Sequence, residues 1–111
     1  MILSLGAFDG FYGKKEKIEL KLELSTSVKR IEVWLKHKDG HSIPMTTGAS
    51  AAGLVSLEAD PQKSTSTLGD YQITRIRLSN GPGLETQYEA RIGDPYFAGS
   101  SLPVRGFTLV P

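Results

Sequence analysis

Two histidines, His37 and His41, are the first residues whose type and spacing could be read as a reactive pair. On a helix, a separation of four residues would place both imidazoles on one face, where they could bind a metal ion. Here Asp39 and Gly40 lie between them, a dipeptide that predicts a two-residue hairpin turn of type I′. In such a hairpin the two imidazoles face opposite sides of the ribbon. We therefore expect two solvated turn histidines and no metal site.

Other catalytic arrangements lack one of their required parts. A serine nucleophile needs a base beside it and a third group to orient that base, and the sequence contains no Gly-x-Ser-x-Gly elbow. A hydrolase with paired carboxylates needs two acids that converge in a cleft, whereas the acids here are spread over outward strand positions and loops. The loop aspartates form no Asp-x-Asp-x-Asp run of the kind that binds calcium: Asp9, Asp60, Asp70 and Asp94. We therefore expect a protein that is not an enzyme and uses neither a metal nor a cofactor.

Trp34 is the residue best suited to binding a partner. It falls in the outward set of its predicted strand, where polar residues alternate with apolar ones. Neighbouring strands should add polar side chains around its ring: Gln72, Arg77, Gln87, Glu89 and Arg91. A tryptophan beside arginines on a polar sheet face is typical of a binding hot spot. The alternative is that lysine and arginine stems cover the ring, with a cation–π contribution of about 0.5–1 kcal/mol.

Tyr96 and Phe97 lie in a predicted long loop over residues 93–103, which also contains two prolines. Two aromatic rings in such a loop either plug one end of a sandwich or present a surface to a protein or a sugar. The candidate binding residues are thus the basic and aromatic positions of two regions: Trp34, Arg77, Arg91, Tyr96 and Phe97. We expect their partner to be a protein or a neighbouring domain, with carbohydrate stacked on the aromatic rings as the second hypothesis.

Alternation of apolar and polar residues predicts the strands that would hold these side chains. Residues 18–24 (IELKLEL) alternate without fault, which indicates a strand with one buried and one wet face. Residues 28–37 follow, with Ile31, Val33 and Leu35 directed inward. The return strand over residues 42–46 contains a proline, Pro44. Because proline cannot donate to a sheet ladder, this strand should lie at an edge.

The best-patterned strand covers residues 68–78 (LGDYQITRIRL). Its apolar pair Tyr71 and Ile73 is out of phase by one residue with the pair Ile76 and Leu78. A β-bulge between the two pairs, near Thr74 and Arg75, would bring both to the same face.

Further strands are predicted over residues 2–8, 54–59, 88–92 and 104–110, and the last should bury Phe107 and Leu109. Residues 60–67 are predicted to form a polar loop. About eight short strands with turns roughly every 10 residues, and no helical period, indicate an all-β antiparallel sandwich. The 111 residues fit a single domain over residues 1–111, without an internal repeat.

Composition argues against several classes of function. The chain has no cysteine, so neither a disulfide nor a thiolate site is available. Thirteen basic and twelve acidic residues give a net charge of +1, which predicts no electrostatic capture of nucleic acid or of an anionic membrane. No apolar run approaches the roughly 18 residues of a membrane span. Residues 1–5 lack the basic flank and the length of a signal peptide, so the sequence alone leaves the compartment open.

Three segments resemble bacterial immunoglobulin-like domains: residues 27–35 (SVKRIEVWL), 69–78 (GDYQITRIRL) and 107–110 (FTLV). The family's strands run as G-V-x-x-V-x-V, then G-x-Y-x-I-x-x-I-x-L, then a closing F-x-V. The chain departs from the family at residues 79–84, where the family has an aspartate and a glycine-asparagine turn. No aspartate-centred role is therefore carried over to this turn.

The resemblance implies an immunoglobulin-like antiparallel β-sandwich of about seven to eight strands. It also implies a non-catalytic spacer, adhesion element or protein-binding module of a bacterial surface or secreted protein, located outside the cell or in its envelope. Tyr71 lies two residues before the position that antibody-type domains give to a cysteine, which makes it a candidate tyrosine corner.

Overall fold

The computed structural model describes residues 1–13, 15–60 and 67–111 of the chain. These ranges contain strands and no helix, so they hold no helical segment that could cross a membrane. Most of the predicted polar loop at residues 60–67 lies outside the described residues. The strands are β1 (Ile2–Leu5), β2 (Phe11–Gly13), β3 (Ile18–Leu24), β4 (Arg30–His37), β5 (Ser42–Thr47), β6 (Gly53–Ala59), β7 (Gly69–Ser79), β8 (Glu85–Glu89) and β9 (Gly106–Val110).

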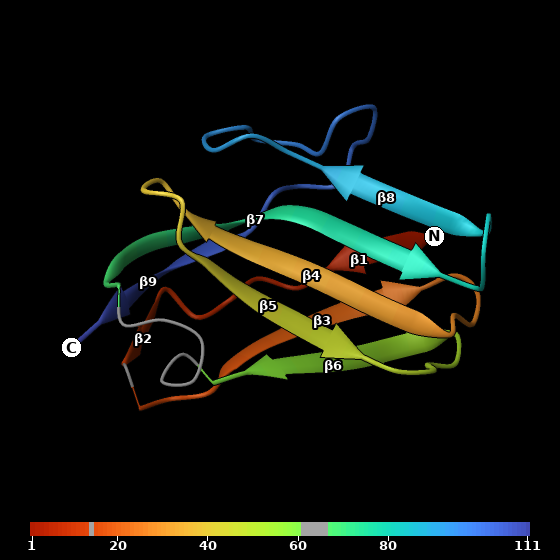
Figure 1. The fold of residues 1–111 in the computed structure, drawn as a ribbon, viewed down its shortest axis with the longest axis horizontal. Helices are drawn as coiled ribbons and strands as arrows, with labels where there is room; N and C mark the ends of the chain where they lie inside the picture. The colour runs from red at the N-terminus through yellow and green to blue at the C-terminus, as the bar shows by residue number, and fades with distance from the viewer. Residues whose placement is uncertain (14, 61–66) are drawn as a thin grey trace.

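The strands form two packed sheets (Figure 1). The smaller sheet has the order β1-β3-β6, and the larger has the order β2-β9-β7-β4-β5, with β8 also paired to β7. Among the described strands, every pair is antiparallel except β2 with β9. The molecule measures 38 × 25 × 23 Å, and the two chain ends lie at opposite ends of the longest axis (Figure 1). The predicted all-β architecture with packed sheets is confirmed.

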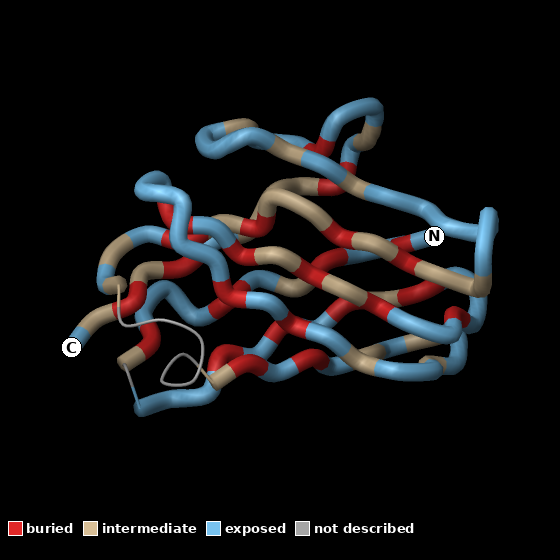
Figure 2. Tube along the Cα trace, viewed as in Figure 1, coloured by how far each residue is buried: buried red, intermediate tan, exposed pale blue. Residues whose placement is uncertain are grey.

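Strands β3 and β4 build the centre of the core from opposite sheets. In β3 every second residue is buried and the residues between them are exposed or half-buried, as the alternation predicted. In β4 the inward residues Ile31, Val33 and Leu35 have no exposed surface. Figure 2 shows this alternation as buried and more exposed segments that follow one another along each strand. Since a fully buried leucine, isoleucine or valine stabilises a fold by about 1.5–3 kcal/mol, these two strands supply much of the hydrophobic driving force.

Strand β7 contains the predicted bulge. Trp34 of β4 lies opposite Arg75, whereas the next residue, Leu35, lies opposite Ile73. Thr74 is therefore the extra residue, and Ile73 and Ile76 both face the core. At the start of the strand, the buried Tyr71 donates its hydroxyl proton to the backbone carbonyl of Thr67, at 2.7 Å.

Strand β5 lies at an edge of the larger sheet, as Pro44 predicted. The turn that leads into it differs from the prediction. Gly40 donates to the carbonyl of His37 at 2.9 Å, and His37 donates to the carbonyl of His41 at 2.8 Å. Gly40 has a φ of +95°, and Asp39 does not have a positive φ. A type I′ turn needs a positive φ at both central residues, so the loop instead has three residues, with glycine in the left-handed position.

The N-terminal region holds a strand that the sequence did not predict. The first strand ends at Leu5 instead of residue 8, and β2 follows a short connection and pairs in parallel with β9. Phe8 and Tyr12 from this region pack edge-on against Phe107, with ring centroids 5.1 and 5.3 Å away. Tyr71 stacks on Phe107 from β7, at 5.6 Å. Four aromatic rings thus close one end of the molecule.

The C-terminal third is divided into two short strands on the same side of β7. β9 pairs with residues 69–72 and β8 with residues 75–79. The predicted strand over residues 88–92 is wrong at its end, because β8 stops at Glu89 and Ile92 is about half exposed. The last strand begins at Gly106 instead of residue 104, and its predicted inward residues Phe107 and Leu109 are buried.

Candidate binding surface

Trp34 lies on the outward face of the larger sheet, opposite Pro44 of β5 on one side and Arg75 of β7 on the other. Two guanidinium groups cover its ring. The Cζ atom of Arg75 is 5.0 Å from the ring centroid, and that of Arg77 is 5.7 Å away. Such contacts are worth about 0.5–1 kcal/mol each at exposed sites. The ring is consequently half-buried, but it remains at the centre of a polar face.

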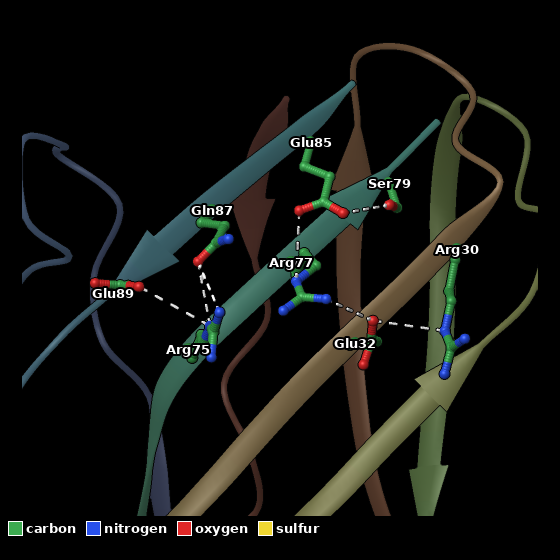
Figure 3. A network of polar contacts seen from close by, with 8 residues as sticks. All are labelled: Arg30, Glu32, Arg75, Arg77, Ser79, Glu85, Gln87 and Glu89. Carbon is green, nitrogen blue, oxygen red and sulfur yellow. Dashed lines mark hydrogen bonds and ion pairs between the residues drawn. The ribbon is translucent and has the colours of Figure 1, made fainter. Parts of the chain in front are cut away.

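A network of charged groups holds the two arginines in place (Figure 3). Arg77 lies between the carboxylates of Glu32 and Glu85, at 3.6 and 3.8 Å, and its Nε atom is shielded from solvent without a hydrogen bond among the described residues. Arg75 donates twice to the side-chain oxygen of Gln87, at 3.1 and 3.2 Å. The exposed Arg75–Glu89 pair contributes about 0–1 kcal/mol. The Arg77 and Glu32 side chains are more shielded, at 29% and 16% exposed, so their pair fixes the position of the Arg77 guanidinium more firmly.

Arg75 is the member of this cluster that the sequence analysis did not select. A strict alternation from Gln72 would place Thr74 outward and Arg75 inward. The bulge at Thr74 changes the phase, so Arg75 and Arg77 share the outward face with Trp34. The phase change between Ile73 and Ile76 was the signal that could have identified it.

Arg91 lies apart from these strands, in the turn that follows β8. Its backbone N–H donates to the carboxylate of Asp94 at 2.9 Å, and its carbonyl accepts from the side-chain amide of Gln72 at 2.7 Å. Gly93 donates to the side-chain oxygen of the same glutamine at 2.9 Å. Gln72 thus ties this turn to β7. Arg91 is exposed and lines a shallow hollow together with Arg75 and Glu89, but among the described residues the cation–π contacts of Trp34 come from Arg75 and Arg77 and not from Arg91.

Tyr96 and Phe97 separate into the two uses expected for the loop. Phe97 is only 1% exposed and packs edge-on against Tyr88 of β8, with 6.2 Å between centroids. It plugs the core, so it is not available on the surface for a partner. Tyr96 is 55% exposed and forms an isolated bridge with Pro103. Only Tyr96 of this pair remains a candidate binding residue.

His37 is buried, so the prediction of two solvated histidines is wrong for this residue. The three-residue loop pairs His37 with His41, and the imidazole of His37 packs against Tyr71 at 5.3 Å. Its Nδ1 atom accepts the backbone N–H of Asp39 at 3.1 Å. His41 is exposed. Within the described ranges, no group of three or more histidine, cysteine, aspartate or glutamate residues is placed so that it could hold a metal ion.

Comparison of the chain with protein-family models, with curated proteins and with solved structures produced no match.

Proposed function

We propose that this chain is an immunoglobulin-like module without catalytic activity, which serves as a spacer or as a protein-binding and adhesion domain of a bacterial surface or secreted protein. The order of its strands supports the fold. In immunoglobulin domains, strands A, B and E of one sheet face strands C, F and G of the other, with C′ added beside C in variable domains. The order β1-β3-β6 against β5-β4-β7-β9 corresponds to this arrangement.

Tyr71 gives a second line of support. It stands near the start of the strand that corresponds to F, and its hydroxyl bonds to the backbone four residues upstream. This is the geometry of a tyrosine corner. Two features depart from the family pattern. The last strand is divided into β8 and β9, and the larger sheet also takes in β2.

Trp34 together with Arg75 and Arg77, here called the Trp34 cluster, is the observation that supports a binding role. Tryptophan and arginine are the residue types most enriched at binding hot spots, and here three of them are in contact at the centre of one face. The surrounding glutamates hold the guanidinium groups before a partner arrives, which lowers the entropic cost of ordering them on binding.

A binding experiment with two matched variants tests this role. Proteins captured by the immobilised wild-type chain would be compared with those captured by Trp34→Ala and by Thr46→Ala, an exposed change on the outward side of β5. We expect partners that bind the wild type and Thr46→Ala, with an affinity for Trp34→Ala that is lower by about 2 kcal/mol, or roughly 30-fold. Equal binding by both variants, with unchanged thermal unfolding, would contradict the role of Trp34.

Carbohydrate binding is the second candidate, because Trp34 and the exposed Tyr96 are both aromatic. A glycan array with the wild type, Trp34→Ala and Tyr96→Ala separates the two proposals. A glycan signal that either variant removes would favour the carbohydrate function, and silence on all glycans would leave the protein-binding module.

A further inference from the structure

A groove of about 520 Å³ opens along one side of the molecule, between β1 of the smaller sheet and β8 of the larger sheet. The loop over residues 98–103 also lines it. Met1 and Leu3 line the groove, and both side chains are more than half exposed. Thr86 of β8 also lines it, although Thr86 lies opposite the buried Leu78 and therefore faces the interior side of its sheet. The two sheets consequently leave an accessible, partly apolar channel between their edges.

The β1 side of the groove already uses its outward backbone groups. Ile2 donates its N–H to the hydroxyl of Tyr88 at 3.0 Å, and the carbonyl of Leu5 accepts from the Nε atom of Arg105 at 3.4 Å. Tyr88 and Arg105 both line the groove and bond to β1. New backbone hydrogen bonds are therefore directed to the opposite wall, which is β8.

The hydrogen-bond register of β8 shows which of its backbone groups face outward. Ala90 donates to the carbonyl of Thr74, and Asn80 donates to the carbonyl of Leu84. Residue pairs in an antiparallel ladder are alternately hydrogen-bonded and non-hydrogen-bonded. The backbone N–H and C=O groups of Thr86 and Tyr88 therefore point to β7. Those of Glu85, Gln87 and Glu89 point away from it. The carbonyl of Glu89 already accepts the N–H of Ala98 at 2.8 Å, so the outward groups of Glu85 and Gln87 are the ones offered to a partner. This edge of β8 is a template for another extended strand.

The opposite edge of the same sheet is protected from such pairing. Because His37 and His41 form a bonded pair, residues 42, 44 and 46 of β5 turn their backbone nitrogens outward. Pro44 occupies the central position of these three and has no N–H to donate. β8 has no proline, so it differs from β5 in its capacity to accept a strand.

The side chains of β8 specify the charge of the strand that would pair with it. Glu85, Gln87 and Glu89 project from the outward face (Figure 3), and the side chains of the two glutamates are 39% and 64% exposed despite their contacts with arginines. A second copy of this chain fits poorly. Antiparallel pairing of two β8 strands about Gln87 would place Glu85 opposite Glu89 twice, and like charges directly opposite one another are destabilising.

We propose that the β8 edge and the groove beside it bind an extended peptide segment of another protein by strand addition. Alternate apolar residues of the peptide enter the groove between the sheets, and basic residues between them lie beside the glutamates of β8. Backbone hydrogen bonds provide affinity in this mode, and alternate side chains provide specificity. The inference rests on the backbone edge of β8 and not on the Trp34 ring, although Glu85, Gln87 and Glu89 also contact the arginines that cover this ring. Trp34→Ala should therefore still bind the peptide, which separates this proposal from the binding role of Trp34.

Titration of the labelled full chain with synthetic heptapeptides, followed by NMR, tests the proposal. The probes are a peptide of alternating lysine and valine, a peptide of alternating glutamate and valine, and a lysine–valine peptide with the same composition but no alternation. We expect only the first to bind, with amide shifts concentrated at residues 1–5, 84–89 and 98–103, which line the groove. No shifts at millimolar peptide, or equal shifts with the glutamate or the non-alternating peptide, would overturn the proposal.

Two proline variants locate the binding edge. Gln87→Pro removes an N–H that points away from β7, so the β7–β8 ladder should remain while strand addition is lost, with binding weaker by about tenfold or more. Thr46→Pro makes the same change at an outward position of β5 and should bind normally. Unchanged binding by a folded Gln87→Pro variant would overturn the proposal.

A charge variant keeps the test decisive if Gln87→Pro fails to fold. Glu85→Gln combined with Glu89→Gln should remove the preference for the lysine–valine peptide over the glutamate–valine peptide, and an unchanged preference would overturn the proposed orientation. Sedimentation of the wild type should show a monomer. A dimer that either glutamine substitution strengthens would identify a second copy as the occupant and would also overturn it.

Discussion

The two halves of β7 pair along the same edge with two different strands, and these two strands differ in how far their side chains are buried. The first half pairs with β9, whose Phe107 and Leu109 are buried in the core. The second half pairs with β8, in which four of five residues are exposed and only Tyr88 is half-buried. Both halves have regular antiparallel registers. Backbone pairing alone therefore does not close a core.

The difference arises from what covers the interior side of each half. Next to β9, the connection before β2 brings Phe8 onto Phe107, and β2 itself brings Tyr12. Next to β8, Tyr88 packs on Phe97 and its hydroxyl accepts the N–H of Ile2 from β1, but Leu3 of β1 remains exposed. Four aromatic rings fill the first gap between the sheets, whereas the second, where Phe97 packs on Tyr88, still leaves an open groove. Stability should be concentrated in the first region and binding capacity in the second.

The largest expected effect comes from Phe107→Ala, which removes the ring shared by Phe8, Tyr12 and Tyr71. Truncation of a buried phenylalanine costs about 3–5 kcal/mol of unfolding free energy, because it loses buried surface and leaves a cavity. Thr86→Ala in β8 is the matched change on the same side of β7, and it should alter stability by no more than about 0.5 kcal/mol. Urea unfolding of both variants gives the comparison. Similar losses from the two would show that the halves are equally packed.

Gly106→Ala tests how closely β9 approaches β7. A Cβ atom at this position would lie 2.5 Å from the backbone oxygen of Tyr71, and a backbone atom cannot move aside as a flexible side chain can. We expect a loss of about 1–3 kcal/mol through overpacking. Gly10→Ala is the control, since its Cβ would meet nothing within 4 Å. Thermal unfolding measures both, and a Gly106→Ala variant as stable as Gly10→Ala would refute the close approach.

The smallest expected effect is that of Tyr71→Phe, which keeps the ring stack on Phe107 and removes only the hydroxyl. The carbonyl of Thr67 would lose the hydrogen bond that it receives from this hydroxyl, and we expect a loss of about 0.5–1.5 kcal/mol. Tyr96→Phe makes the same chemical change at an exposed ring and should have almost no effect. Equal stability of the two variants in chemical unfolding would show that the hydrogen bond from the Tyr71 hydroxyl contributes little to the free energy of unfolding.

Local alternation made much of the fold predictable. The inward faces of β3 and β4, the edge position of β5 and the bulge in β7 all follow from a period of two and its single interruption. β2 was missed because three residues are too few to show a period, and its position depends on parallel pairing with β9, almost a hundred residues away in sequence. Contacts of this kind are set by the packed sheets and leave no local pattern.

The candidate surface was predictable only in part, for the same reason. Trp34 and Arg77 were identified from alternation. To identify Arg75, the phase change at the bulge had to be followed on the outward face as well as in the core. Phe97 and Tyr96 are neighbours in an irregular loop, where no period indicates which ring is buried. His37 was misplaced because a one-residue difference in loop length changes its partner across the hairpin.

The position of the chain ends has a mechanical consequence. β1 and β9 both run along the length of the molecule, with the start of β1 and the end of β9 toward opposite ends (Figure 1). Tension applied between the two ends would pull each of these strands along its own axis, against β3 for β1 and against β7 and β2 for β9. Under such shear, the hydrogen bonds of a strand must rupture together instead of opening one after another. A chain held under load by its two ends would therefore resist extension through its terminal strands first.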